Sequence, residues 1–464
     1  MNSNTKSDIL FEKKKKGLST TSQIILGFLC AILIGAVLLS LPVASVSGES
    51  DFLTALFTST TSVCVTGLVV VDTFSYWTLF GKIVILILIQ LGGLGIVAFT
   101  SSILLMFNKK VTLKDRMVIQ DAYNLNNLQG MVIFVKKIIF GTFTVEIIGA
   151  FLYMIEFVPL YGARGVWYSF FNSISAFCNA GIDIIGNDSL ISFNSSPLVL
   201  ITTMMLIFNG GIGFVVWWDV VDLLKRVIKK EVKPLDFYRN LALHSKLVIN
   251  ITFGLIFVGG LLLFLFEHNN TGTIGDMTLG DKILNSLFQS VTLRTAGFAA
   301  IDQGALTEPS VMICIVLMII GGSPVGTAGG IKTVTFAVLF FAVLAVVRGR
   351  KETVVFNKSI NDNLIRKSLA VAFISIGAFF FFSILLIVTN GFSLTDAIFE
   401  VASAIATVGL SRGVTPELNN IGRVIIIIAM YLGRIGPISM FVAFSNKYSI
   451  KNSIHYSEAE IIVG

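Results

Sequence analysis

The sequence predicts an all-α polytopic membrane protein: four covalently linked repeats of outer helix, re-entrant pore helix with its loop, and inner helix, around a pseudo-fourfold pore. The membrane follows from composition, because 55% of the 464 residues are hydrophobic, only 13% are charged and the mean hydropathy is +0.86. A soluble domain carries about 25% charged residues. A large soluble enzyme would need more polar surface than this. The number of repeats follows from one motif that recurs at nearly constant spacing.

Several apolar runs approach the roughly 20 residues that span a bilayer. They are Ile24–Leu41, Met131–Phe157, Leu247–Phe266 and Leu369–Thr389. These runs predict outer helices near residues 21–42, 132–158, 247–266 and 367–390. Further apolar segments predict inner helices near residues 79–107, 196–224, 309–347 and 421–446.

The basic residues, which give a net charge of +7, gather in a few connections between the apolar segments. By the positive-inside rule these connections and both termini are cytoplasmic, in a multi-pass membrane protein. Nucleic-acid binding would need the basic residues on one soluble face, and no such domain is predicted. The clusters are Lys13–Lys16, Lys109–Arg116, Lys136–Lys137, Lys225–Arg239, Arg348–Lys367 and Lys447–Lys451.

Four segments share an amphipathic stretch led by an aromatic residue and a polar turn with a glycine. The turn glycines are 114, 116 and 112 residues apart, and a second cluster of small residues follows each of them. The turn glycines are Gly67, Gly181, Gly297 and Gly409, and the clusters begin at Gly92, Gly210, Gly321 and Gly433. The predicted divisions are a basic tail 1–20 and pore repeats 21–110, 111–230, 231–350 and 351–464.

The amphipathic stretches, at about 10 residues, are too short to span a membrane. They must enter and leave on one side, which the charge clusters place outside. Non-helical backbone at membrane depth is tolerated only where it is buried in protein or lines a wet cavity. Four such loops in one chain therefore predict a meeting point on a common axis.

Backbone carbonyls from four loops can replace the water shell of a monovalent cation without a fixed charge. Glycine permits the backbone angles that this requires. Thr407-Val408-Gly409 matches the core of the potassium-channel TVGYG loop, and no apex carries a ring of Asp or Glu. The candidate filter residues are Val63, Cys64, Val65, Thr66 and Gly67; Phe177, Cys178, Asn179, Ala180 and Gly181; Leu293, Arg294, Thr295, Ala296 and Gly297; and Ala406, Thr407, Val408 and Gly409.

Over nearly its whole length the sequence resembles the KtrB-type membrane subunits of bacterial Ktr potassium uptake systems, within the Trk/Ktr/HKT superfamily of potassium transporters. The resemblance is carried by Val63–Leu68, Thr292–Phe298, the glycine-rich run 321–330 and Gly433–Pro437. It implies potassium as the transported ion and a preference for potassium at Gly67. It leaves a sodium-coupled or sodium-conducting member, and sodium as an activating ion, as alternatives.

The resemblance also implies partners: a homodimer with a pore in each protomer, and a cytoplasmic ring of RCK-type (KtrA-like) subunits that carry ATP or ADP. No cofactor is expected in this chain. The basic segments 225–239 and 348–367 are candidate docking surfaces, although topology determinants that contact anionic lipid explain them equally well.

The glycine-rich run Gly321–Thr333 lies inside the third inner segment, where so many glycines and a proline end a helix. A kink with close helix packing is one interpretation, and a gate under the filter is what the resemblance implies. A Walker A loop is rejected, because Ile331 separates Gly330 from Lys332. The candidate gate residues are Gly321, Gly322, Ser323, Pro324, Gly326, Thr327, Ala328, Gly329, Gly330, Lys332 and Arg434.

Ionisable residues at membrane depth are functional candidates. Arg434 is expected to face the pore and contact the gate; the alternative is an ion pair with Glu400 or Asp396. Arg294 is expected to anchor the third loop or to be exposed in the vestibule. Glu146 is expected to pair with another helix, with direct ion binding as the alternative. Asn179 and Gln289 are expected to brace loops rather than to act as ligands, and Asp183 to bias the vestibule or lie on the loop surface.

An enzyme would need a cluster of His, Asp, Glu or Cys near one membrane face, and the sequence shows none. Its four cysteines, Cys30, Cys64, Cys178 and Cys314, lack CxxC spacing, and its three histidines are scattered. A purely structural or receptor role would leave the four apices unexplained. Ion transport is therefore the predicted function.

Overall fold

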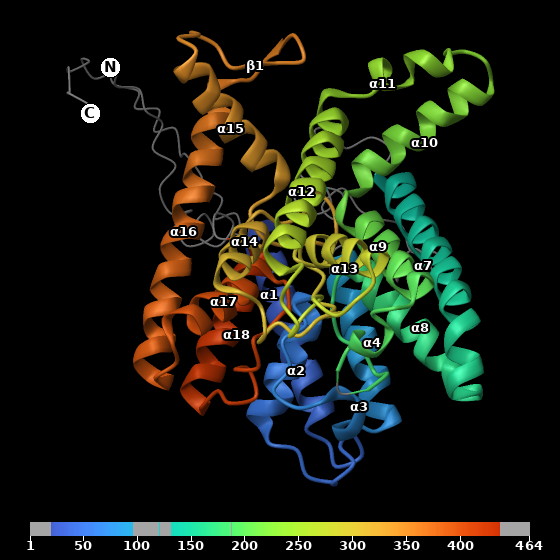
Figure 1. Ribbon diagram of the computed structural model, residues 1–464, viewed down its shortest axis with the longest axis vertical. Coiled ribbons are helices and arrows are strands. Elements are labelled where there is room, and N and C mark those ends of the chain that lie inside the picture. The colour runs from blue at the N-terminus through green and yellow to red at the C-terminus, as the bar shows by residue number, and fades with distance from the viewer. Residues whose placement is uncertain (1–19, 96–119, 121–130, 187, 437–464) are drawn as a thin grey trace, which may run out of the picture.

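The computed structural model describes residues 20–95, 120, 131–186 and 188–436 (Figure 1). Four helices in this part are long and apolar enough to cross a membrane. They fall where outer helices were predicted and differ by a few residues at their ends. They are α1 (Thr20–Leu39), α7 (Met131–Tyr161), α12 (Leu243–Glu267) and α16 (Asp362–Asn390).

Each long helix is followed by a shorter helix that ends at one of the predicted apices. These have 13 to 16 residues, so the predicted length of about 10 was too short. The extra residues precede the aromatic residues from which the prediction started. The helices are α2 (Phe52–Cys64), α8 (Ala163–Cys178), α13 (Leu279–Thr292) and α17 (Leu394–Ala406).

The predicted inner helices begin as expected. The third is interrupted at its glycine-rich run, where helix-ending residues were noted, and the second is interrupted where no break was predicted. They are α4 (Leu79–Leu94), α9 (Pro197–Gly211) with α10 (Phe214–Ile228), α14 (Glu308–Ile319) with α15 (Thr333–Val347), and α18 (Asn420–Ile435). The axes of α9 and α10 differ by 100°, so a single helix over 196–224 was wrong. Gly213 has φ +92° at the break, and the chain 321–327 packs into it.

The remaining elements are small and lie in connections. Two of them, β1 (Val354–Val355) and β2 (Lys358–Ser359), form one antiparallel hairpin. With α11 and the far end of α10 the hairpin occupies the upper end of the molecule in Figure 1, so the basic segments 225–239 and 348–367 share one end. These elements are α3 (Thr73–Tyr76), η1 (Ile191–Phe193), η2 (Pro234–Asp236), α11 (Phe237–Asn240), β1 (Val354–Val355) and β2 (Lys358–Ser359). The basic clusters 13–16, 109–116 and 447–451 lie outside the described residues.

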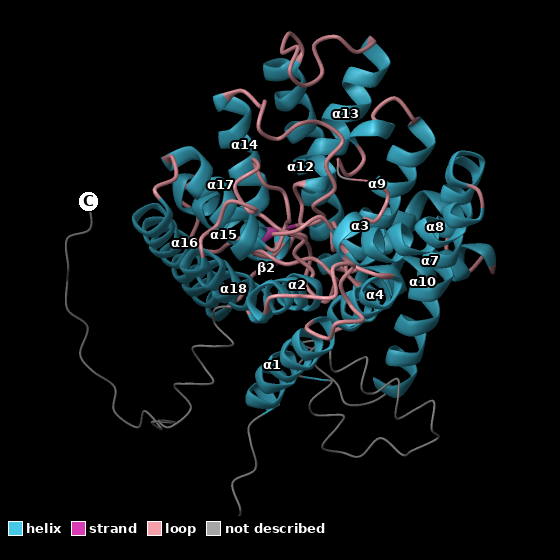
Figure 2. Ribbon diagram, turned by 90° about the horizontal axis from the view of Figure 1, so that it is seen from below, coloured by secondary structure: helices cyan, strands magenta, loops and turns pink. Residues whose placement is uncertain are grey.

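The helices pack in a closed cyclic order, which Figure 2 shows end-on. Each shorter helix packs on the long helix before it: α2 on α1, α8 on α7, α13 on α12 and α17 on α16. Each also packs on the inner helix of the preceding unit: α8 on α4, α13 on α9, α17 on α14, and α2 on α18. The last contact joins the end of the chain to its beginning and closes the ring.

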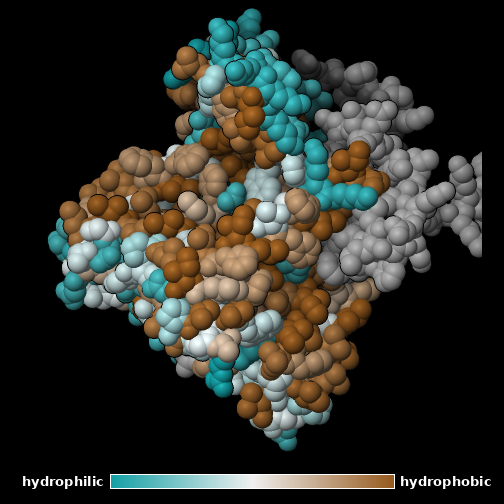
Figure 3. All heavy atoms as spheres, turned by 90° about the vertical axis from the view of Figure 1, so that its right-hand side faces the viewer, coloured by the Kyte–Doolittle hydropathy of each residue, from teal (hydrophilic) through white to brown (hydrophobic). Residues whose placement is uncertain are grey.

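On the face that Figure 3 shows, the surface is mostly apolar across the middle of the molecule and hydrophilic at the upper end. Large apolar side chains point outward from the long helices, including Phe140 on α7, Phe257 on α12 and Phe373 on α16, which are 75%, 67% and 81% exposed. Exposed apolar area of this extent is typical of a surface that faces lipid.

Candidate functional site: four loops around a common centre

The four shorter helices end in loops that need unusual backbone angles. We call the chain at Val63–Gly67, Phe177–Gly181, Leu293–Gly297 and Ala406–Gly409 the apex loops. In each, the residue two positions before the glycine has positive φ: Val65 at 57°, Asn179 at 60°, Thr295 at 74° and Thr407 at 53°. For β-branched residues this conformation is strained, and such strain is concentrated at functional sites.

The four glycines lie next to one another around one centre. A Cβ atom on Gly67 would lie 2.6 Å from the carbonyl oxygen of Ala180, and one on Gly181 would lie 2.5 Å from that of Ala296. A Cβ on Gly297 would likewise strike the oxygen of Val408, and one on Gly409 the oxygen of Thr66. The contacts thus run from the first loop to the second, third and fourth and back to the first.

This ring brings together the carbonyl oxygens of the residues before the glycines, from Thr66, Ala180, Ala296 and Val408. The side chains of the other candidate filter residues are almost fully buried. Among the described residues no group of three or more His, Cys, Asp or Glu is placed to hold a metal ion. The oxygen atoms that meet at the ring are those of main-chain carbonyls. These buried residues are Val63, Cys64, Val65, Phe177, Cys178, Asn179, Leu293, Arg294, Thr295, Ala406 and Thr407.

A cavity of about 150 Å³ opens on one side of the ring, and all four glycines line it. Two carboxylates, of Asp72 and Asp183, also line it. Asp72 caps α3, accepting the backbone N–H of Phe74 at 3.2 Å and of Ser75 at 2.8 Å. Partial burial in the cavity wall raises the pKa of Asp183 to about 6.

On the opposite side of the ring lies the chain 321–332, which we call the glycine-rich loop. The Thr327 hydroxyl donates to the carbonyl of Phe177 at 3.3 Å, and a Cβ on Gly329 would strike the Thr407 hydroxyl. The second and fourth apex loops are therefore in direct contact with the glycine-rich loop, and the third reaches it through Arg294. The alternative interpretation of this segment was a kinked helix. The structure has no helix between Ile319, where α14 ends, and Thr333, where α15 begins.

The glycine-rich loop is held at the break between α9 and α10. Ser323 donates its backbone N–H to Gly211 O at 2.9 Å, and Thr327 donates to Gly210 O at 3.1 Å. Phe214 in turn donates to Val325 O at 2.9 Å. The remaining gate candidates, Gly321, Gly322, Pro324, Gly326, Ala328 and Gly330, belong to this same segment.

Two cationic side chains donate hydrogen bonds to consecutive carbonyls of the glycine-rich loop. Arg434, in the last turn of α18, donates to Thr327 O and also to Gly92 O at the end of α4. Lys332 donates to Ala328 O at 2.6 Å. The alternative partners predicted for Arg434 are engaged elsewhere: Asp396 pairs with Arg412 at 2.8 Å. Glu400 accepts the hydroxyls of Ser411 and Thr415.

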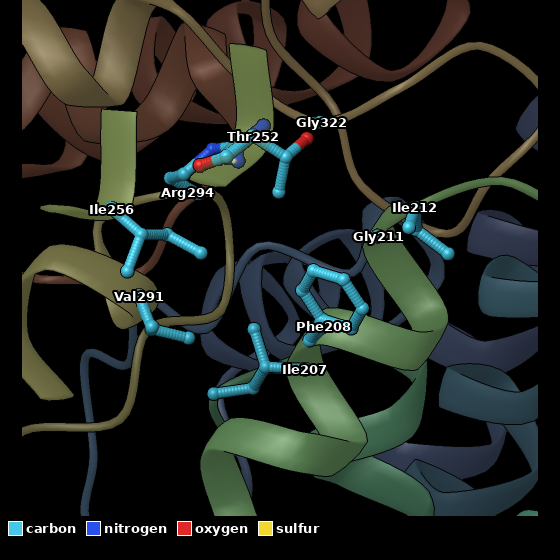
Figure 4. A pocket seen from close by; sticks show the side chains of 9 residues that line it. All are labelled: Ile207, Phe208, Gly211, Ile212, Thr252, Ile256, Val291, Arg294 and Gly322. Carbon is cyan, nitrogen blue, oxygen red and sulfur yellow. Dashed lines mark hydrogen bonds between the residues drawn. The ribbon is translucent and has the colours of Figure 1, made fainter. Parts of the chain in front are cut away.

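Arg294 connects the third apex loop to two other segments. Its guanidinium donates to Thr252 O on α12 at 3.3 Å and to Gly321 O at 3.2 Å. Figure 4 shows it beside Thr252 and Gly322, at a cavity of about 20 Å³ whose other side chains are apolar. Since only 7% of Arg294 is exposed, the alternative of an exposed vestibule residue was wrong.

Other polar groups brace the apex loops from behind. Glu146 on α7, only 3% exposed, accepts the amide of Gln90 on α4 at 3.3 Å. With its side-chain amide turned, Asn179 donates to Ala176 O and Ile207 O, at 3.0 and 3.3 Å. Gln289 donates to Gln303 at 2.6 Å.

Hydroxyl groups on the shorter helices are the contacts that sequence reasoning missed. Thr61 and Ser403 accept the backbone N–H groups of Gly67 and Gly409, each at 2.9 Å. Ser175 and Thr292 donate to the carbonyls just after the other two glycines. The sequence signal that could have found them is their position, five or six residues before each glycine. It was masked by the many neighbouring hydroxyl residues, such as the run Thr58–Ser62.

Comparison with known proteins places this arrangement among cation transporters. Residues 14–456 match the TrkH family, described as cation transport proteins. The chain is 39% identical to Ktr system potassium uptake protein B of Bacillus subtilis, over 95% of both chains. It is 34% identical to the potassium/sodium uptake protein NtpJ of Enterococcus hirae, over 98% of this chain and all of that one. The crystal structure of the potassium transporter TrkH from Vibrio parahaemolyticus has the same fold, with a TM-score of 0.72 at 16% identity, over 93% of this chain and 86% of that one.

Proposed function

The chain belongs to the TrkH family of cation transport proteins, and from this premise we propose that it mediates potassium uptake across a membrane, through a single pore formed by its four apex loops. The observation that carries the proposal is the closed ring of glycines, in which a side chain on any of the four would strike the next loop. A structural role for these loops would not need such close approach at one point.

The ring supplies the chemistry that a dehydrated potassium ion requires. Carbonyl dipoles from Thr66, Ala180, Ala296 and Val408 replace water ligands without a fixed charge that would trap the ion. Each shorter helix also directs its C-terminal, partially negative end at the ring. The candidate filter residues then have two roles, with carbonyls at the centre and buried side chains that hold the loops in place.

The four units act as pseudo-fourfold repeats in this proposal. Long, shorter and inner helices take the roles of outer, pore and inner helix, with repeats at 21–110, 111–230, 231–350 and 351–464 after a basic tail 1–20. Support comes from the cyclic packing, in which α18 of the last unit closes on α2 of the first. The basic segments that share one end of the molecule support a multi-pass topology in a bacterial plasma membrane, with that end and both termini in the cytoplasm.

The glycine-rich loop is the gate in this proposal. It contacts three apex loops, through Phe177, Arg294 and Thr407. Its carbonyls at Thr327 and Ala328 accept hydrogen bonds from Arg434 and Lys332. Breaking such contacts is a small step compared with moving a whole helix. A gate of this kind can respond to cytoplasmic partners, and relatives named as parts of a Ktr system support the presence of partner subunits. The proposed partners are an RCK-type ring that binds ATP or ADP and, in a homodimer, a second copy of this chain.

The flux of potassium is the direct test. Purified protein in proteoliposomes should take up radioactive rubidium down a potential that is negative inside, and excess potassium should compete with it. Sodium flux measured in parallel tests the second candidate, a sodium-conducting transporter, which is favoured by the potassium/sodium name of one relative. Absence of rubidium uptake in vesicles that hold monodisperse protein would contradict the proposed function.

The vestibule carboxylate predicts a pH dependence. Because the pKa of Asp183 is raised to about 6, its carboxylate is charged at neutral external pH and attracts cations to the cavity. It becomes neutral as the pH falls through about 6. Rubidium uptake at low concentration should then decrease by roughly two- to fivefold, the size expected for one nearby charge in a wet site.

Asp183→Asn should remove this pH dependence and fix uptake at the low value. Asp188→Asn is the matched control, since Asp188 is an exposed carboxylate of the same connection that does not line the cavity. A pH profile of Asp183→Asn that coincides with the wild-type profile would contradict the role of Asp183.

A further inference from the structure

The hydroxyl groups that face the apex loops fall into two kinds. In the first and fourth loops the hydroxyl accepts a hydrogen bond from the backbone N–H of the glycine itself. Gly67 donates to the Thr61 hydroxyl, and Gly409 donates to the Ser403 hydroxyl. Each acceptor lies six residues before its glycine and is fully buried. The two bonds are equal in length, at 2.9 Å, although the loops differ in sequence.

In the second and third loops the hydroxyl acts on a carbonyl instead. Ser175 donates to the oxygen of Ile182 at 2.5 Å, and Thr292 donates to that of Phe298 at 2.8 Å. Both carbonyls belong to the residue just after the glycine. They are turned back toward their own short helix, away from the ring.

The amide bonds determine which way two of the ring carbonyls point. A trans peptide is planar, so its N–H and C=O point in opposite directions. The peptide between Thr66 and Gly67 donates its N–H to Thr61 on α2. Its carbonyl therefore points away from α2, and its oxygen lies beside Gly409. The peptide between Val408 and Gly409 is held in the same way by Ser403, with its carbonyl beside Gly297.

We propose that the hydroxyls of Thr61 and Ser403 are specificity-determining positioning groups, which hold the carbonyls of Thr66 and Val408 toward the transported ion. Without the hydroxyl, the peptide can rotate and present its N–H to the centre, where it repels a cation. The second and third loops lack this hydroxyl bond, and the N–H of Gly297 instead makes a long contact of 3.5 Å with Thr292 O. The two halves of the ring are therefore held in different ways. This inference rests on the proposed function and adds the residues that set the affinity of the ring.

Isosteric removal of the hydroxyl tests the proposal. Thr61→Val keeps the shape of the side chain and loses the acceptor. The loss of one hydrogen bond should raise the KM for rubidium uptake by about three- to tenfold, with the maximal rate within about twofold of wild type. Discrimination against sodium should decrease in parallel. Thr61→Ser, which keeps the hydroxyl, should restore the wild-type KM.

Thr60→Val is the matched control, because Thr60 is the adjacent buried threonine on α2 and its hydroxyl bonds only to Leu56 O in the same helix. Ser403→Ala repeats the test in the fourth loop, and it decides the question if Thr61→Val is not monodisperse. An unchanged KM in the hydroxyl-free variant, or an equal rise in Thr60→Val, would overturn the inference. Absence of uptake by the wild-type protein would instead contradict the proposed function.

Discussion

Replacing Gly67 by serine is expected to reduce the discrimination of potassium over sodium by at least about tenfold and to slow rubidium uptake. Gly67 has φ +104°, a conformation that is nearly restricted to glycine and costs other residues about 1–3 kcal/mol. The new Cβ would also lie 2.6 Å from Ala180 O and 3.1 Å from Gly409 Cα. Both neighbours are backbone atoms of other apex loops, so the ring itself must move to relieve the contact.

A movement of a few tenths of an ångström matters because ion selectivity depends on the field and spacing of the ring oxygens. A difference of about 1.4 kcal/mol between two ions is a factor of ten. A displaced carbonyl weakens coordination of potassium, and the serine hydroxyl offers a flexible ligand to the smaller, more strongly hydrated sodium ion. Rubidium and sodium uptake should be measured in the same proteoliposomes to give the ratio directly.

Gly413→Ser provides the control for backbone strain. Gly413 has φ +94°, close to that of Gly67, but a Cβ there would meet nothing within 4 Å. Both substitutions cost conformational energy, and only Gly67→Ser disturbs the ring. Wild-type selectivity in Gly67→Ser, with normal folding, would contradict the proposal that the apex loops form the filter.

The spacing of the turn glycines predicted that the four glycines meet at one centre, because each of them occupies the same position in a repeated unit. The long helices were also predictable, since a bilayer requires uninterrupted apolar runs. The contact between Gly409 and Thr66 O joins residues far apart in the chain. No sequence pattern gives that contact directly, and it follows only if four equal units close into a ring.

The break between α9 and α10 could not be predicted, and the reason is tertiary. Glycine pairs near the ends of α4 and α9 look alike in sequence, at Gly92-Gly93 and Gly210-Gly211. The chain turns by 100° after the second pair, where the backbone of Ser323 and Thr327 competes for the helix carbonyls. The role of Thr61 was hidden for a related reason, since local sequence does not show which of five consecutive hydroxyl residues faces the loop.

Replacing Arg434 by alanine is expected to increase rubidium uptake, by about tenfold if the glycine-rich loop limits the flux. The Arg434 side chain joins Thr327 O in that loop to Gly92 O on α4, so it fixes the loop to a helix of the first unit. Hydrogen bonds from a charged donor are worth about 1.5–3 kcal/mol each. The substitution also removes a positive charge that repels potassium below the ring.

Arg434→Lys separates these two effects. Lysine keeps the charge, but its single ammonium lacks the planar fork that reaches two carbonyls at once. If bridging closes the gate, uptake should increase in Arg434→Lys nearly as much as in Arg434→Ala; if charge dominates, Arg434→Lys should resemble wild type. Unchanged uptake in Arg434→Ala would contradict the gating role, because a bridge that limits ion passage cannot be removed without an effect on flux.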